Sequence, residues 1–466
     1  MQNRRKFLRS MLSMPLALAG GSMLSPLTVT PALGADVSGY RALVCVFLFG
    51  GMDCHDTVLP YDQASYDSYA QIRASLLQSY AALPGGSTRT RDSLLELDPA
   101  TPSADGRRFA LPPELAGLHS LFEQGRAAIV GNVGPLLEPT QRAAFLDGTA
   151  ALPARLFSHN DQQSTWMSFA PEGSQLGWGG LFSDAAVQAG ANTQSIFSQV
   201  SLAGNAVFLT GNQVSPYQIS ADGVPSILLI DAAGDRLSPQ AQAAMRDHFA
   251  ATASAPFNLF ERDFVDLSRV SLDANDTLEA ALASATTVTT PFPASALGAQ
   301  LAAVARTIAV RETLGAGRQV FFVAQGGFDT HSAQAQDLPG LQQGIGDAIA
   351  AFYAATEELG VAEQVTTFTA ADFGRTLTVN GDGTDHGWGG HHFVVGGAVR
   401  GGDIYGDIPV AELGHAQDAG NGRLIPTTAV EQFAAPLGSW FGLDAGELAG
   451  ALPGLGAFGA PALDFI

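Results

Sequence analysis

Charged side chains, and basic ones in particular, are scarce in this 466-residue sequence. Only 14% of the residues are Asp, Glu, Lys or Arg, and 23 basic residues face 44 acidic ones, which leaves a formal net charge of -21. A chain this acidic is repelled by nucleic acid and by anionic membranes, so we expect neither as its main partner. An anionic substrate must be attracted locally, by a metal ion or by arginine, against the field of the whole protein.

Cysteine is almost absent, which argues against a disulfide framework. Cys45 lies in the middle of the expected strand ALVCVFLFG, and Cys54 follows beyond the end of that strand. An extended strand keeps two such residues too far apart to bond. We interpret Cys45 as a small core residue. Cys54 lies beside an acid-rich turn, where a reactive thiol is the less favoured reading.

Long apolar runs are also missing, because MLSMPLALAGGSML is too short and too interrupted by Gly and Pro to span a membrane. It follows NRRKFLRS, in which Phe and Leu stand behind paired arginines, and it precedes TPALGAD. This layout predicts a twin-arginine signal peptide over residues 1–35, cleaved near Gly34 or Ala35, with an ordinary secretory signal as the alternative. We therefore expect a periplasmic or secreted protein that meets the twin-arginine translocase during export and has no stable membrane span.

Apolar runs of strand length recur along the chain and alternate with helical patterns. Buried strands are predicted at residues 41–51, 126–134, 318–326, 365–369 and 393–397. Amphipathic helices are predicted at residues 115–122 and 344–360. This alternation predicts an α/β fold, in which a mostly parallel central sheet carries helices on both faces. We expect one large domain over residues 36–466, with a smaller insertion lobe at roughly 177–300.

The potential metal ligands are densest in VTTFTAADFGRTLTVNGDGTDHGWGGHHFVVGG, residues 365–397. Five of them lie between the two strands of this stretch: Asp372, Asp385, His386, His391 and His392. Carboxylate and imidazole bind Zn²⁺, Mn²⁺ and similar ions, and open α/β sheets build their sites in loops at strand ends. We interpret Asp372, Asp385 and His386 as metal ligands, and His391 as a ligand or a residue that orients one. The alternative is that these side chains only cap turns.

Two other strand ends carry the same kinds of side chain. Asp53 follows the first strand, behind two glycines that let the backbone approach another segment closely. Asp329 and His331 follow the strand at residues 318–326. Together with a helix start described next, these loops hold six of the nine histidines. The clustering predicts one site assembled from distant segments.

A fourth loop leads into the predicted helix start FSHNDQQSTWMSF, residues 157–169. Ser158 or Asn160 can cap this helix, and a helix N-terminus attracts anions. A hydroxyl at such a position, near metal ligands, is where an ester hydrolase keeps its nucleophile. The alternative is that Ser158 only caps the helix, while His159 or Asp161 forms an internal hydrogen bond.

With these loops identified, the sequence resembles the bacterial domain-of-unknown-function 1501 family, whose members carry twin-arginine signals. The segments that carry the resemblance follow the family's order over most of the mature chain: FLFGGMDCHDTVLPYDQASYDSY, NVGPLLEPT, LFSHNDQQ, GGFDTH, ADFGRT and GTDHGWGG. That family looks like a branch of the alkaline phosphatase/sulfatase superfamily. The resemblance implies an alkaline phosphatase-like fold, a two-metal site and a nucleophile at a helix start.

The resemblance also implies roles for individual residues. The acids and imidazoles that match metal ligands are Asp53, Asp329, His331, Asp372 and His386. Ser158 falls where the superfamily has its nucleophile. Phe373 stands where relatives have His, and no sulfatase-type Cys-x-Pro-Ser-Arg is present. These departures argue against a formylglycine sulfatase and suggest that one metal site is altered or absent.

Two functions fit these observations. The first is an exported, metal-dependent hydrolase of phosphate or sulfate esters, with a small-molecule or polymer ester as substrate. One or two divalent ions, Zn²⁺ or else Mn²⁺, Mg²⁺ or Ca²⁺, would activate Ser158 or a water molecule. Arg375 would hold a substrate oxygen, or would instead pair with one of the carboxylates. The second is a non-catalytic exported scaffold or surface-assembly protein. Redox chemistry is less favoured because the ligand set is rich in carboxylates.

Overall fold

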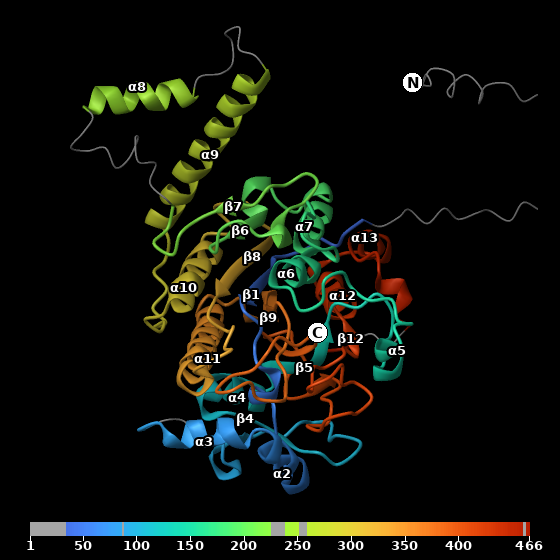
Figure 1. Ribbon diagram of the computed structural model, residues 1–466. Helices are drawn as coiled ribbons and strands as arrows, with labels where there is room; N and C mark the ends of the chain where they lie inside the picture. The colour runs from blue at the N-terminus through green and yellow to red at the C-terminus, as the bar shows by residue number, and fades with distance from the viewer. Residues whose placement is uncertain (1–33, 86–87, 225–237, 251–258, 460–462) are drawn as a thin grey trace, which may run out of the picture. The chain divides into compact units, whose positions relative to one another are not determined.

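The computed structural model describes residues 34–85, 88–224, 238–250, 259–459 and 463–466 (Figure 1). The predicted signal peptide lies outside these residues, except for its last two positions, and so do two parts of the expected insertion lobe. Among the described helices, none combines the length and the apolar character that a membrane crossing requires. Both cysteines are free and buried, and the core position predicted for Cys45 is confirmed.

In the described part of the chain, nine strands form one sheet, whose order is β11-β5-β10-β9-β1-β8-β6-β7, with β12 paired to β5. The strands are β1 (Arg41–Leu48), β5 (Ala127–Gly134), β6 (Gln199–Ser201), β7 (Tyr217–Gln218), β8 (Arg318–Gln325), β9 (Val365–Ala371), β10 (Gly390–Gly396), β11 (Ile404–Gly406) and β12 (Thr428–Ala429). β1 is central and runs parallel to both β8 and β9. β10 is antiparallel to both β9 and β5. The predicted α/β class with a large, mostly parallel sheet is confirmed.

Strand alternation divides the core between the two faces of the sheet. Val44 and Val46 of β1 pack into one apolar cluster, whereas Leu43, Cys45 and Phe47 pack into the other. Successive side chains of a strand point to opposite faces, so an uninterrupted apolar run covers both. The first cluster is completed by helices α4 (Ala116–Glu123), α10 (Ala296–Ala309) and α11 (Gln334–Glu358). The second is completed by α6 (His159–Ser168), α7 (Trp178–Gln188), α12 (Val430–Phe441) and α13 (Ala445–Ala451).

Smaller elements surround this core. A second sheet has the order β2-β4-β3, formed by β2 (Leu59–Pro60), β3 (Leu95–Glu96) and β4 (Phe109–Leu111). The remaining helices are α2 (Gln63–Ile72), α3 (Ala74–Ala82), α5 (Arg142–Leu146), α8 (Pro239–Ala250) and α9 (Leu259–Ala283). Within the expected insertion lobe, β6 and β7 extend the main sheet beyond β8.

Two boundaries differ from the sequence-based expectation. β10 begins at Gly390, so His391 and His392 lie inside the strand instead of in the loop before it, and both are 2% exposed. Helix α11 begins at Gln334, ten residues before the predicted start at 344. Its first turns contain Pro339 and several polar residues, so the sequence there lacks the helical spacing of apolar residues from which a helix is predicted.

Candidate metal centre

The loops that carry the predicted ligands meet at one edge of the sheet. β1, β8 and β9 are parallel neighbours, so their carboxyl ends lie together. The loop before β10 reaches the same edge because that strand runs the opposite way. The two glycines after β1 permit the close approach: a Cβ on Gly50 would lie 2.3 Å from the backbone nitrogen of Asp329, and one on Gly51 would lie 2.4 Å from the Phe373 ring. Both have positive φ angles, of 113° and 83°, which favour glycine.

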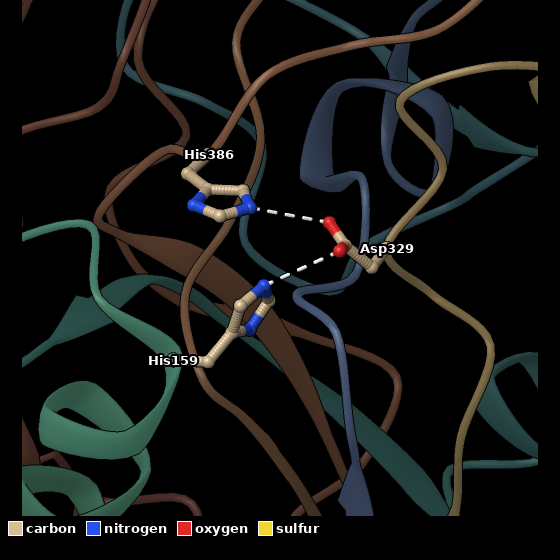
Figure 2. A group of neighbouring side chains, drawn as sticks. All are labelled: His159, Asp329 and His386. Atoms are coloured by element: carbon tan, nitrogen blue, oxygen red, sulfur yellow. Dashed lines mark hydrogen bonds and ion pairs between the residues drawn. The ribbon is translucent and has the colours of Figure 1, made fainter.

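The carboxylate of Asp329 is the common neighbour of three imidazoles. Its Oδ1 lies 3.1 Å from Nε2 of His331 and 3.2 Å from Nε2 of His386, and its Oδ2 lies 3.4 Å from Nε2 of His159. Figure 2 shows His159 and His386 approaching Asp329 from two different segments of the chain. The potential ligand atoms of these three residues all lie within 4.8 Å of one another. The Asp329 side chain is 45% exposed, so the group is open to solvent.

His386 presents a lone pair to this group. Its Nδ1 lies 2.8 Å from the carbonyl oxygen of Phe157, and a carbonyl only accepts, so Nδ1 carries the proton. Burial lowers the pKa of His386, which favours the neutral ring. The Nε2 lone pair therefore faces Asp329 and, at 2.9 Å, Nε2 of His331. The carbonyl that fixes this ring belongs to a residue with a φ of 71°, a strained value for a non-glycine residue.

The other two imidazoles are oriented by carboxylates. His331 has its Nδ1 3.3 Å from Oδ1 of Asp385. His159, the first residue of α6, has its Nδ1 2.5 Å from Oδ2 of Asp372, and this hydrogen bond raises the pKa of His159. Asp372 is fully buried and also accepts hydrogen bonds from the Gln163 side chain and the Gly50 backbone. Carboxylates in this position orient imidazoles in metal sites and raise their basicity as ligands.

The donor set fits a divalent ion. Among the described residues, Nε2 of His159 and Oδ1 of Asp372 are buried atoms that lack a hydrogen-bond partner, and such atoms call for an explanation. Two nitrogens bound to one tetrahedral zinc lie about 3.3 Å apart, given bonds of about 2.0–2.1 Å. The separation of 2.9 Å between Nε2 of His331 and Nε2 of His386 is close to that value. Three imidazoles and one carboxylate suit zinc and similar borderline ions.

Arg375 forms an ion pair with Asp329 from the buried side of the site. Its Nη1 donates to Oδ1 of Asp329 at 3.0 Å and to the Gly50 carbonyl at 2.8 Å, and its Nε donates to the Thr384 hydroxyl at 3.0 Å. The guanidinium is fully buried, so it positions the carboxylate and does not reach solvent. Burial alone would raise the pKa of Asp329, but the hydrogen bond and charge of Arg375 outweigh it and lower that pKa. The sequence analysis gave two roles for Arg375, substrate binding or pairing with a carboxylate, and the structure has the ion pair with Asp329.

Ser158 precedes His159 at the start of α6. It occupies the N-cap position, yet its side chain makes no capping hydrogen bond. Its hydroxyl donates instead to Oδ2 of Asp161 at 2.9 Å, and Arg155 holds the other oxygen of that carboxylate at 3.0 Å. Asp161 therefore fixes the direction of the hydroxyl.

Four predicted ligands do not join the group around Asp329: Asp53, His391, Asp372 and Asp385. Asp53 is fully buried in an ion pair with Arg73. His391 lies inside β10, where its Nδ1 accepts the backbone N–H of Asn132 at 2.9 Å. Burial lowers the pKa of His391 to about 3, so the ring is a neutral core group. Asp372 and Asp385 contact Nδ1 of His159 and of His331, whereas Nε2 of each ring faces Asp329.

His159 is the member of the group that sequence patterns did not identify as a ligand; an internal hydrogen bond was the only role that they suggested for it, as an alternative. That hydrogen bond exists, to Asp372, but it turns the other ring nitrogen toward Asp329. The signal that was available is the position of this histidine at a helix start beside Ser158, in one of the four histidine-bearing loops.

The chain matches a known protein family over most of its length. Residues 40–450 match the family model described as "Protein of unknown function (DUF1501)". No curated protein matches the chain.

Proposed function

Because this chain belongs to the DUF1501 family, whose description leaves the function open, we propose from the site itself that it is a metal-dependent hydrolase of phosphate or sulfate esters. The observation that carries the proposal is the convergence of three imidazole Nε2 atoms on the carboxylate of Asp329, at the solvent-open edge of the sheet. In this proposal His159, Asp329, His331 and His386 hold one divalent ion.

A divalent ion in such a site supplies a Lewis acid that polarises an ester and lowers the pKa of a hydroxyl or water. The residues of the chain supply the rest. Asp372 and the Phe157 carbonyl hold His159 and His386 in the required tautomer, and Asp385 lies 3.3 Å from Nδ1 of His331. The Ser158 hydroxyl, held by Asp161 next to a ligand, is the proposed nucleophile. The N-terminus of α6 favours a bound anion.

Wider assignments rest on the sequence and remain part of the proposal. The order of the motifs and the mostly parallel sheet support a place in the alkaline phosphatase/sulfatase superfamily. The paired arginines of NRRKFLRS support export by the twin-arginine route to the periplasm or beyond. That route carries folded proteins, so the ion would be loaded before export.

The test is hydrolysis of an aryl phosphate and an aryl sulfate by protein depleted of metal and then reloaded with Zn²⁺ or Mn²⁺. We expect turnover by the loaded protein, a loss of more than about 100-fold on depletion, and little turnover by Ser158→Ala. His119→Ala serves as the control, because His119 lies on α4 and contacts the Glu96 carbonyl. A loaded protein that hydrolyses no ester in a broad panel would refute the hydrolase and favour the non-catalytic scaffold.

A further inference from the structure

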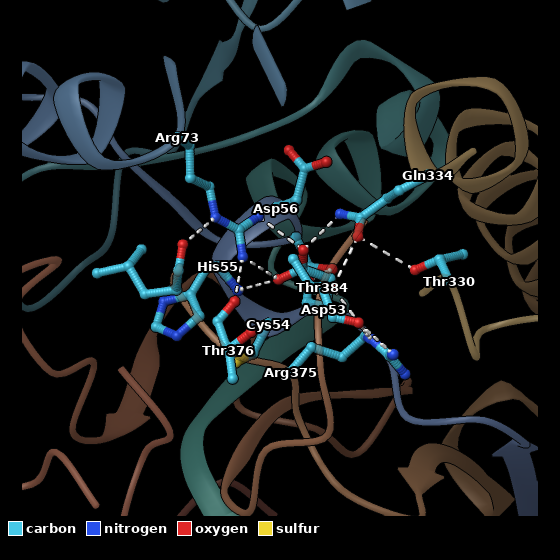
Figure 3. Close-up of polar contacts among 12 residues, drawn as sticks. Asp53, Cys54, His55, Asp56, Arg73, Thr330, Gln334, Arg375, Thr376 and Thr384 are labelled. Atoms are coloured by element: carbon cyan, nitrogen blue, oxygen red, sulfur yellow. Dashed lines mark hydrogen bonds and ion pairs between the residues drawn. The ribbon is translucent and has the colours of Figure 1, made fainter. Parts of the chain in front are cut away.

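Asp53, a second carboxylate at the same edge of the sheet, forms an ion pair with Arg73. Arg73 grips Asp53 with two hydrogen bonds, from Nη1 to Oδ2 at 2.6 Å and from Nη2 to Oδ1 at 3.0 Å. Both side chains are fully buried. Figure 3 shows Arg73 in contact with Asp53, in the loop that follows β1, and with the segment that contains Thr376. Arg73 reaches it from the junction of α2 and α3, and its remaining donors bind the carbonyls of Thr376 and Leu377.

No oxygen of Asp53 is left free for a metal ion. Its Oδ2 accepts from Arg73 and, at 2.6 Å, from the side-chain amide of Gln334. Its Oδ1 accepts from Arg73 and, at 3.1 Å, from the backbone N–H of His55. A bidentate guanidinium is permanently charged and complements a carboxylate in shape as well as in sign. A divalent ion would have to displace it within a fully buried pocket.

The charges around the site fit a single ion. Among the described residues, four carboxylates contact the three imidazoles or the arginines Arg73 and Arg375: Asp53, Asp329, Asp372 and Asp385. Asp56, in the same loop as Asp53, is paired separately with Arg89. Two guanidiniums face the four carboxylates, Arg73 on Asp53 and Arg375 on Asp329. They cancel two of the four negative charges, and one divalent ion cancels the other two. A second divalent ion would leave an excess of positive charge next to two buried arginines, which is costly at low dielectric.

The two ion pairs are joined by a directed chain of hydrogen bonds. Nε of Arg375 donates to the Thr384 hydroxyl, which donates to Oε1 of Gln334 at 2.7 Å. The amide of Gln334 then donates to Asp53. Thr330 also donates to Oε1 of Gln334, so the orientation of the amide is fixed from both ends. Asp53 is therefore an anchor behind the site and does not face the ion.

We propose that this protein binds a single ion at this site and that Arg73 takes the place of a second metal at Asp53. The inference rests on the proposed metal centre, and it departs from the two-metal site that the family resemblance implies. Asp53, which the sequence nominated as a ligand, is assigned to positioning.

The experiment is a count of bound Zn²⁺ per chain by native mass spectrometry after exhaustive dialysis. We expect one ion in the wild-type protein. We expect one ion also in the double variant Asp53→Asn, Arg73→Gln, which removes both charges together, with an affinity within about tenfold of wild type. Asp329→Asn, the matched carboxylate-to-amide change, should lose more than about 100-fold in affinity.

Two ions in the wild-type protein, or loss of the ion from the double variant while its circular dichroism and melting temperature stay near wild type, would overturn the proposal. If the double variant does not fold, the wild-type count still decides the matter. One bound ion without ester turnover would leave this inference standing and would refute only the hydrolase.

Discussion

A single histidine ring carries much of the proposed centre. His159 links the buried carboxylate of Asp372 to the exposed carboxylate of Asp329 through its two nitrogens. The amino-acid sequence identifies the residue types in each loop, but it does not say which imidazole nitrogen forms a hydrogen bond within the protein and which faces the site. That depends on contacts such as the one between Asp372 and His159, which join residues 213 positions apart. Asp329 and His386 could therefore be nominated from sequence, whereas the role of His159 could not.

Replacing His159 should remove a ligand without unfolding the protein, since its side chain is 28% exposed. We expect His159→Ala to weaken Zn²⁺ binding by more than about 100-fold, measured by competition with a chromophoric chelator. His119→Ala, on α4, should bind as tightly as wild type. Equal affinities in the two variants would show that His159 is not a ligand.

Asp372 acts on the ion through His159, so its replacement should have a milder effect. We expect Asp372→Asn to reduce Zn²⁺ affinity by about 10–100-fold while one ion per chain still binds at saturation. The amide oxygen can still accept a hydrogen bond from Nδ1–H of His159, but it no longer supplies a charge. A complete loss of binding at saturating Zn²⁺ would instead make Asp372 a direct ligand.

The site is built at the carboxyl ends of the parallel strands, where the two glycines that follow β1 allow a close approach of neighbouring segments. Strands of continuous apolar sequence can be recognised from the sequence alone. Each of the five buried strands given in the sequence analysis is present. The direction of β10 and the inclusion of His391 in it were not predictable from periodicity. His391 is a polar residue whose burial depends on the backbone N–H of Asn132, a distant partner.

Gly50 should be the most sensitive point of this arrangement. A Cβ there would lie 2.3 Å from the Asp329 backbone, in addition to the strain of a φ of 113°. Gly173 has a φ of 106°, and a Cβ added to it would have nothing within 4 Å, so this position isolates the strain alone. We expect Gly173→Ala to lower the free energy of unfolding by about 1–3 kcal/mol, and Gly50→Ala to lower it further and to weaken Zn²⁺ binding. Urea unfolding of both variants measures this, and equal losses would mean that the close approach is unimportant.

On the scale of the whole molecule, acid should destabilise the fold through buried histidines. Burial lowers the pKa of both His391 and His392 to about 3, from the ordinary value of 6.5. The unfolded chain therefore binds more protons than the native protein between these values, so stability rises with pH from about 3 to about 6.5. Unfolding across this range should take up about one proton fewer in His391→Asn than in wild type. An unchanged slope of stability against pH would contradict this assignment.

The net charge of -21 acts on any anionic substrate before it reaches the site. Raising the ionic strength from about 0.01 M to 0.15 M shortens the Debye length from about 30 Å to about 8 Å and screens this repulsion. We expect kcat/KM for an aryl phosphate to rise over this range, and kcat/KM for an uncharged aryl ester, if one is turned over, to stay constant. A fall with salt for the anion would show that local positive charge dominates its approach.

The position of the bound ion decides whether the proposed centre exists. Crystals grown with Zn²⁺ and measured at the zinc absorption edge give an anomalous difference map. We expect one strong peak, about 2.0–2.1 Å from Nε2 of His159, His331 and His386 and next to the Asp329 carboxylate. A peak at Asp53, or no peak within reach of these imidazoles, would show that the ion is held elsewhere or not at all.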